Sequence, residues 1–155
     1  MKNKYFTPDI EDICIGYEYE QLVTPLSESL GKGEEEWMKC KFPDPFTIDR
    51  ILLLYERKKQ LRVSYLTKEQ IEDEGFIYRG KISHGTIPGE PFTKIELEFI
   101  KDNILIKFDV MCNKIMIDKA DITEENVNFY NVKTLYHGEC KDINTFRKII
   151  KLLGI

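Results

Sequence analysis

A short segment in the middle of the chain carries the most constraining local signal. Thr67 can cap the amino terminus of a helix, while Gln70, three residues later, can reach back to the Thr67 amide in a capping box. Gly75 can adopt the left-handed conformation that ends many helices, and Phe76 follows it as in a Schellman motif. Apolar residues also occupy the two positions of a hydrophobic staple: Leu66 and Ile71. Because these independent signals agree, residues 66–76 predict one short helix capped at both ends.

Strands are predicted wherever apolar and polar residues alternate with a period of two. These segments are 13–20, 37–42, 61–66, 77–82, 94–100, 104–110, 115–117 and 135–140. We expect 37–42 to pair back on 13–20, and residues 101–103 to form a hairpin turn between two strands.

Two more helices are predicted. The first, near 45–60, follows Asp44 as its cap and Pro45 at the first helical position, and the second, near 143–153, is capped by Asp142 and closed by Gly154. Long loops are expected at 24–36 and 83–91. The fold class is therefore α+β, a mainly antiparallel sheet with about three helices and the C-terminal helix packed on one sheet face. A chain of 155 residues fits a single domain, 1–155.

Composition excludes several classes of protein. The net charge of −4 argues against general nucleic-acid binding, which normally needs a basic excess. No apolar run reaches the roughly 20 residues of a membrane span, and no apolar region follows the basic N-terminus as in a signal peptide, so we expect a cytoplasmic protein. The four cysteines are scattered without close pairs, which favours free thiols and gives no zinc site. No cofactor motif is present.

Histidines, cysteines and carboxylates give the candidates for catalysis. His84 lies in a glycine-containing loop and could act as an acid or base, although a solvated loop histidine is the simpler interpretation. His137 and Cys140 would face opposite sides of a strand and so form no dyad. Two pairs of carboxylates point the same way from their strands, which suits acid–base work or a cation but is more typical of a polar sheet face: Glu18 with Glu20, and Glu96 with Glu98.

Basic and aromatic residues give the candidates for binding. The one basic cluster comprises Arg57, Lys58, Lys59 and Arg62, where a phosphate group could bind, but cations also favour helix C-termini through the helix dipole alone. Aromatic residues are abundant enough to build a partner-binding surface, and the candidates are Tyr17, Tyr19 and Trp37.

Three stretches of the sequence together resemble a known group of proteins. They are YFTPDIE at 5–11 leading into GYEYE at 16–20, RVSYLTKEQIE at 62–72 followed by GF at 75–76, and LLGI at 152–155. The chain resembles small uncharacterised proteins encoded by phages and prophages of gut anaerobic bacteria, a group with no assigned activity. The resemblance implies a phage or mobile-element origin and expression in the cytoplasm of a bacterial host.

Taken together, these patterns favour a non-enzymatic phage accessory protein that binds, and plausibly inhibits, a host or phage protein. Two alternatives stay open. One is a small nucleotide- or metabolite-binding protein or enzyme that uses His84 with nearby carboxylates, and the other is a virion or assembly component that forms homo-oligomers.

Overall fold

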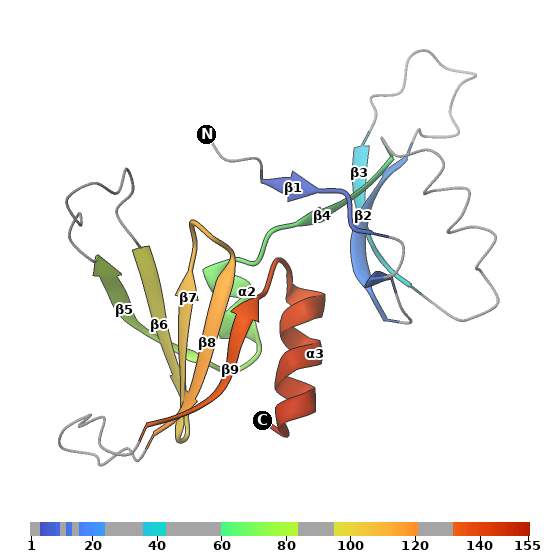
Figure 1. The fold of residues 1–155 in the computed structure, drawn as a ribbon. Coiled ribbons are helices and arrows are strands. Elements are labelled where there is room, and N and C mark those ends of the chain that lie inside the picture. Colours follow the sequence, from blue (N-terminus) through green and yellow to red (C-terminus); the bar gives the residue numbers. More distant parts are fainter. Residues whose placement is uncertain are drawn as a thin grey trace, which may run out of the picture. The chain divides into compact units, whose positions relative to one another are not determined.

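The computed structural model describes residues 4–9, 12–13, 16–23, 36–42, 60–83, 95–120 and 132–155 (Figure 1). The chain divides into two compact units, Met1–Tyr65 and Leu66–Ile155. The expectation of one domain over residues 1–155 stays a prediction.

The N-terminal unit contains a four-stranded antiparallel sheet in the order β1-β4-β2-β3. Its strands are β1 (Tyr5–Phe6), β2 (Glu18–Val23), β3 (Glu36–Lys41) and β4 (Leu61–Ser64). The predicted pairing of 37–42 with 13–20 is confirmed, since β2 and β3 pair over six residues. The strand predicted at 13–20 corresponds to β2, which begins later, at Glu18. Gly16 has a φ of +84° and interrupts the extended backbone before it.

One face of this sheet is apolar. Its core consists of Tyr17, Phe42 and Val63, with Phe6, Ile13 and Tyr19 packed against it. Aromatic contacts join neighbouring strands on this face, with ring centroids 4.9 Å apart for Phe6 and Tyr65 and 6.0 Å apart for Tyr19 and Phe42. The opposite face therefore carries the alternate, more polar residues of each strand.

The C-terminal unit contains a five-stranded antiparallel meander in the order β5-β6-β7-β8-β9. Its strands are β5 (Ile77–Ser83), β6 (Ile95–Lys101), β7 (Ile104–Asp109), β8 (Lys114–Lys119) and β9 (Lys133–Glu139). The predicted hairpin turn is confirmed: Lys101 pairs with Ile104, and Asp102 between them has a φ of +51°. Sequential strands pair throughout, as is usual when connections are short.

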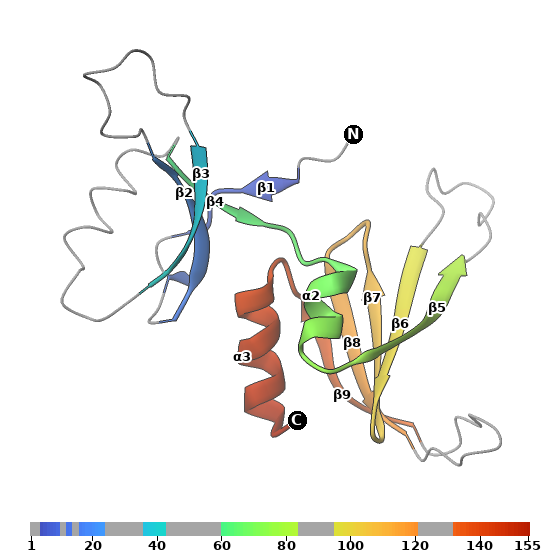
Figure 2. The same ribbon diagram turned by 180° about the vertical axis from the view of Figure 1, so that it is seen from behind.

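Two helices contribute to the core of this unit (Figure 2). Helix α2 (Lys68–Asp73) has the predicted capping box: the Gln70 amide donates to the Thr67 hydroxyl, and the Thr67 amide donates to the Gln70 side chain. Gly75 has a φ of +87°, as predicted for the residue after the helix.

Helix α3 (Ile143–Leu153) begins after Asp142, whose carboxylate accepts a hydrogen bond from the Thr145 amide, and ends at a left-handed Gly154. Its apolar face is buried against the sheet residues of the same core: Ile143, Phe146, Ile149 and Ile150. Phe146 is fully buried and meets the Phe76 ring edge-on at 5.8 Å. The predicted packing of the C-terminal helix on one sheet face is therefore confirmed.

The α+β class is confirmed, with two differences from the expectation. The described strands form two antiparallel sheets rather than one, because alternation identifies a strand but does not specify which strand it pairs with. The described residues contain two helices, and the predicted helix near 45–60 lies outside them, as do almost all of the predicted loops at 24–36 and 83–91.

Candidate functional site: an arginine stacked between two aromatic rings

The polar face of the N-terminal sheet brings together residues from all four strands. Arg62 on β4 lies directly opposite Glu20 on β2. Tyr5 pairs with Ser64, two residues after Arg62, and Trp37 pairs with Leu22, two residues after Glu20. Because side chains two residues apart share a face, these four side chains all project from the same side of the sheet.

The guanidinium of Arg62 lies between two aromatic rings. Its Cζ atom is 3.7 Å from the ring centroid of Tyr5 and 3.8 Å from that of Trp37. Its Nε donates a hydrogen bond of 2.8 Å to Oε2 of Glu20. We call Tyr5, Glu20, Trp37 and Arg62 the arginine stack. Cation–π attraction on both faces of the guanidinium, together with a charge-assisted hydrogen bond at its edge, fixes the side chain in one orientation.

The arginine stack is partly open to solvent. The side chain of Arg62 is 26% exposed and that of Glu20 is 17% exposed. Arginine has five N–H donors and stays charged at any physiological pH. Within the described residues Nε donates to Glu20, and the two Nη groups carry the other four donors.

Of the binding residues predicted from sequence, the structure brings Trp37 and Arg62 together. Tyr17 is only 3% exposed and belongs to the core on the opposite face, and Tyr19 packs partly buried against that core, so we assign both to packing. Tyr5 was missed as a candidate because only strand pairing brings it to Arg62. His84, Arg57, Lys58 and Lys59 lie outside the described residues.

Three of the four predicted carboxylates are partly exposed on their sheets, whereas Glu96 is buried, at 7% exposed. Glu20 is held by Arg62, and Glu18 lies 3.9 Å from Lys41 in a largely exposed ion pair. Glu96 and Glu98 lie on β6, where Glu98 stands opposite Lys107 in the sheet register. The described residues contain no group of three or more His, Cys, Asp or Glu side chains that could hold a metal ion.

His137 and Cys140, which were expected to point away from each other, differ in exposure. Cys140 is fully buried in the core, whereas His137 is exposed on β9. Burial, and to a lesser extent the nearby Asp142 carboxylate, raises the pKa of the Cys140 thiol, so the reactive thiolate is disfavoured. Cys40 and Cys112 are free thiols.

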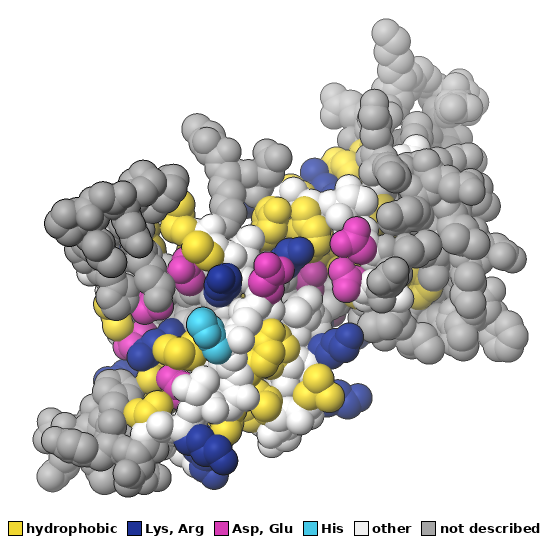
Figure 3. Space-filling view, viewed as in Figure 1, with side chains coloured by type: hydrophobic (Ala, Val, Ile, Leu, Met, Phe, Trp, Pro, Cys, Tyr) yellow, Lys and Arg dark blue, Asp and Glu magenta, His cyan; other side chains and the backbone are white. Residues whose placement is uncertain are grey.

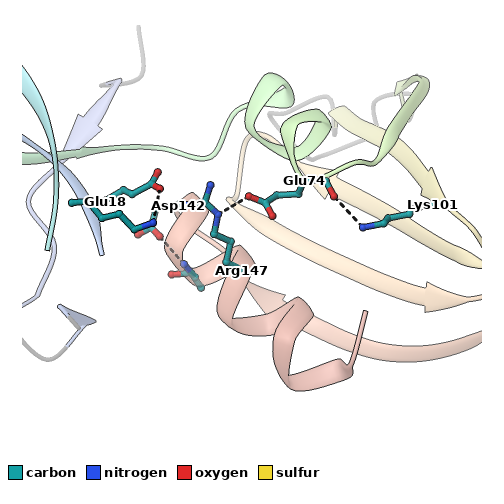
Figure 4. A network of polar contacts seen from close by, with 7 residues as sticks. Glu18, Glu74, Lys101, Asp142 and Arg147 are labelled. Atoms are coloured by element: carbon teal, nitrogen blue, oxygen red, sulfur yellow. Dashed lines mark hydrogen bonds and ion pairs between the residues drawn. The ribbon is translucent and has the colours of Figure 1, made fainter. Parts of the chain in front are cut away.

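A polar network in the C-terminal unit has a structural role (Figure 4). The guanidinium of Arg147 on α3 donates to the Glu74 carboxylate, and Lys101 Nζ donates to the Glu74 main-chain oxygen at 3.1 Å. The network therefore gives a main-chain carbonyl at the C-terminal end of α2 a hydrogen-bond donor, and it joins that end to α3 and β6.

The surface drawn in Figure 3 carries both signs of charge. Over its described part, acidic and basic side chains lie between small groups of hydrophobic ones. In this view, the described part of the surface is neither uniformly charged nor uniformly apolar.

Comparison of the chain with known protein families, with curated proteins and with solved structures finds no match. Among the described residues, no helix is long and apolar enough to cross a membrane.

Proposed function

We propose that this chain is a non-enzymatic accessory protein of a phage or mobile element, and that it binds a protein of the bacterial host through the polar face of its N-terminal sheet. The arginine stack is the observation that carries this proposal. The phage context comes from the resemblance of the sequence at 5–20, 62–76 and 152–155 to small phage and prophage proteins.

The composition of the arginine stack suits protein recognition. Tryptophan, tyrosine and arginine are the residue types most enriched among the few side chains that dominate binding energy at interfaces. Here the tyrosine and the tryptophan each contact the arginine, and the three residues come from three different strands. A partner can pack on the rings while a polar group accepts hydrogen bonds from the Nη donors.

The rigidity of the arginine stack also favours binding. A free arginine loses considerable side-chain entropy when an interface immobilises it, on the order of 1 kcal/mol. Arg62 is already held by two rings and by Glu20. Most of that entropy loss therefore occurs when the chain folds, which lowers the free-energy cost of complex formation.

Catalysis has less support among the described residues. A guanidinium, the side-chain group that Arg62 contributes to the arginine stack, is a poor general base. Cys140, the buried thiol, is held in its neutral form. An ordered, fully protonated cation beside two aromatic rings is better suited to recognition than to proton transfer.

The test is a comparison of captured proteins between matched variants. The tagged chain is incubated with a lysate of a gut anaerobic bacterium, and bound proteins are quantified by mass spectrometry. Arg62→Lys keeps the charge but removes the planar stacking group, and Trp37→Ala removes one ring. Arg79→Lys is the matched control, because Arg79 is exposed on β5 and lies outside the arginine stack.

We expect one host protein to be retained by the unmodified chain and by Arg79→Lys but lost with Arg62→Lys and Trp37→Ala. Trp37 is the single tryptophan of the chain, so its fluorescence should also change when the purified partner is added. Equal capture by all four proteins, or retention of a small molecule instead of a protein, would contradict the proposal.

A further inference from the structure

The outer edge of β3 differs from the other sheet edges. All six residues of β3 pair in continuous register with β2 on one side, and no described strand pairs with its other side. At the edges of the five-stranded sheet, β5 carries an irregularity between Tyr78 and Gly80, and β9 has an extra residue opposite the step from Ile117 to Asp118. Such bulges protect sheet edges from added strands. Among the longer described edge strands, β3 alone is regular.

The backbone groups on the open edge of β3 can be identified. Phe42, directly after β3, donates its amide to the Tyr17 oxygen at 2.9 Å, and its own oxygen accepts from the Gly16 amide at 3.1 Å. Phe42 therefore points its backbone groups toward the β2 side. Because these groups alternate along a strand, the amides and carbonyls of Trp37, Lys39 and Lys41 point outward.

The side chains of β3 differ between the two faces of the sheet. Lys39 and Lys41 project from the face of the arginine stack, and both are exposed. Lys39 lies opposite Glu20, but Glu20 is held by Arg62, and the Lys39 ammonium forms no ion pair with a described residue. Lys41 has only its long contact with Glu18, at 3.9 Å. Within the described part of the chain, this face of the edge therefore carries two exposed lysines, and their one ion pair there is the 3.9 Å contact of Lys41.

The other face of β3 is apolar at its centre. Met38 is 51% exposed, and Cys40 beside it is half-buried. If a further strand paired with β3, its successive side chains would lie alternately on the two faces of the sheet. Residues opposite Lys39 and Lys41 would be favoured if acidic, and residues next to Met38 and Cys40 would be favoured if apolar.

We propose that β3 accepts an extended segment of the partner protein as a fifth strand, and that this segment alternates acidic with apolar residues. The inference rests on the proposed function and specifies how the partner binds. Main-chain hydrogen bonds to Trp37, Lys39 and Lys41 supply affinity in this mode, and the alternating side chains supply specificity. The arginine stack lies next to the edge that would receive the added strand, because Trp37 belongs both to the stack and to β3.

The first test uses the unmodified chain and synthetic peptides. A blocked peptide about eight residues long, alternating glutamate and valine, is long enough to cover β3. Its matched control alternates lysine and valine. Amide hydrogen exchange is followed by NMR on labelled protein. We expect the glutamate peptide to slow exchange at Trp37, Lys39 and Lys41, and the lysine peptide to leave it unchanged. No protection at these amides with the glutamate peptide in excess, or equal protection by both peptides, overturns the proposal.

The second test removes one outward donor. Lys39→Pro deletes an amide that points away from β2, which an edge strand tolerates, whereas Lys39→Thr removes the same charge and keeps the amide. We expect Lys39→Pro to weaken binding of the glutamate peptide at least about tenfold beyond the effect of Lys39→Thr. Equal binding by the two variants overturns the proposal.

The two proposals fail in different ways. If captured host protein is lost with Trp37→Ala but retained by Lys39→Pro, the chain is a binding protein that does not use strand addition. If neither substitution affects capture, the proposed function itself fails. The peptide experiment gives its result in either case.

Discussion

Replacing Arg62 with methionine should destabilise the N-terminal unit by about 2 kcal/mol. Methionine keeps an unbranched apolar stem between the rings but removes the guanidinium. Two cation–π contacts at partly exposed sites contribute about 0.5–1 kcal/mol each, and a hydrogen bond between charged groups about 1.5 kcal/mol, so the gross loss is about 3 kcal/mol. Contacts of the methionine sulfur with the two rings should recover about 1 kcal/mol.

The single tryptophan makes the assay specific to this unit. Trp37 lies in the arginine stack, so its fluorescence during urea unfolding reports the N-terminal sheet. Lys41→Met is the matched control on the same sheet face, because Lys41 and Glu18 are 3.9 Å apart with side chains 67% and 40% exposed. Exposed pairs of this kind contribute roughly 0–1 kcal/mol, so the control should change the free energy of unfolding very little.

A double-mutant cycle separates the ion pair from the ring contacts. Combining Arg62→Met with Glu20→Gln should give a coupling free energy of about 1 kcal/mol, because either single substitution already removes the ion pair. The coupling should shrink as salt is added. If Arg62→Met changes the free energy of unfolding no more than Lys41→Met does, the arginine stack does not stabilise the sheet, and the reasoning above is refuted.

Four further predictions concern the C-terminal unit, and circular dichroism during denaturation follows the first two. Thr67→Ala should cost about 1 kcal/mol of stability through loss of the capping box, whereas Thr67→Ser should cost much less; equal effects would contradict the role of the hydroxyl. Gly75→Ala should lower the free energy of unfolding by about 1 kcal/mol because φ is +87°. Gly80→Ala is the control and should be nearly neutral, because its φ is not in the left-handed region and nothing lies within 4 Å of the added Cβ. A larger effect of Gly80→Ala would count against the left-handed end of α2. In the native protein at pH 8, iodoacetamide should modify exposed Cys112 and spare Cys140, which mass spectrometry can show. Burial raises the pKa of the Cys140 thiol, so the folded state favours the protonated thiol. This contribution to stability is present below the unfolded-state pKa of about 8.5. It declines at higher pH, by up to about 1.4 kcal/mol per pH unit. In Cys140→Ala the free energy of unfolding should fall less between about pH 8 and pH 10. An unchanged fall would contradict the assignment of this part of the pH dependence to Cys140.

Local features of the fold were predictable from sequence because their signals are local. The capping box of Thr67 and Gln70, the left-handed Gly75 and the Asp142 cap each depend on residues within one or two turns of a helix. The division into two sheets was not predictable in this way. It depends on which strands pair, and alternation of apolar residues is the same whichever partner a strand has.

The candidate site shows the same limit. Trp37 and Arg62 were predicted as binding residues on separate grounds, one as an aromatic and the other as part of a basic cluster. Nothing in the sequence links them with Tyr5 and Glu20, which lie far from them along the chain and meet only in the folded sheet. Tyr17 was predicted to bind a partner but is buried, because the apolar face that it shares with Tyr19 forms the core of the sheet.

The hydrogen bond from the Leu66 amide to the Lys141 oxygen has a consequence for the order of folding during synthesis. It joins the first residue of the C-terminal unit to the segment just before α3, and α3 supplies four buried core residues. The core of this unit cannot close until α3 has been translated. The N-terminal unit is complete in sequence at Tyr65 and can fold while the ribosome is still producing the rest of the chain. The N-terminal sheet would then exist before the meander has formed.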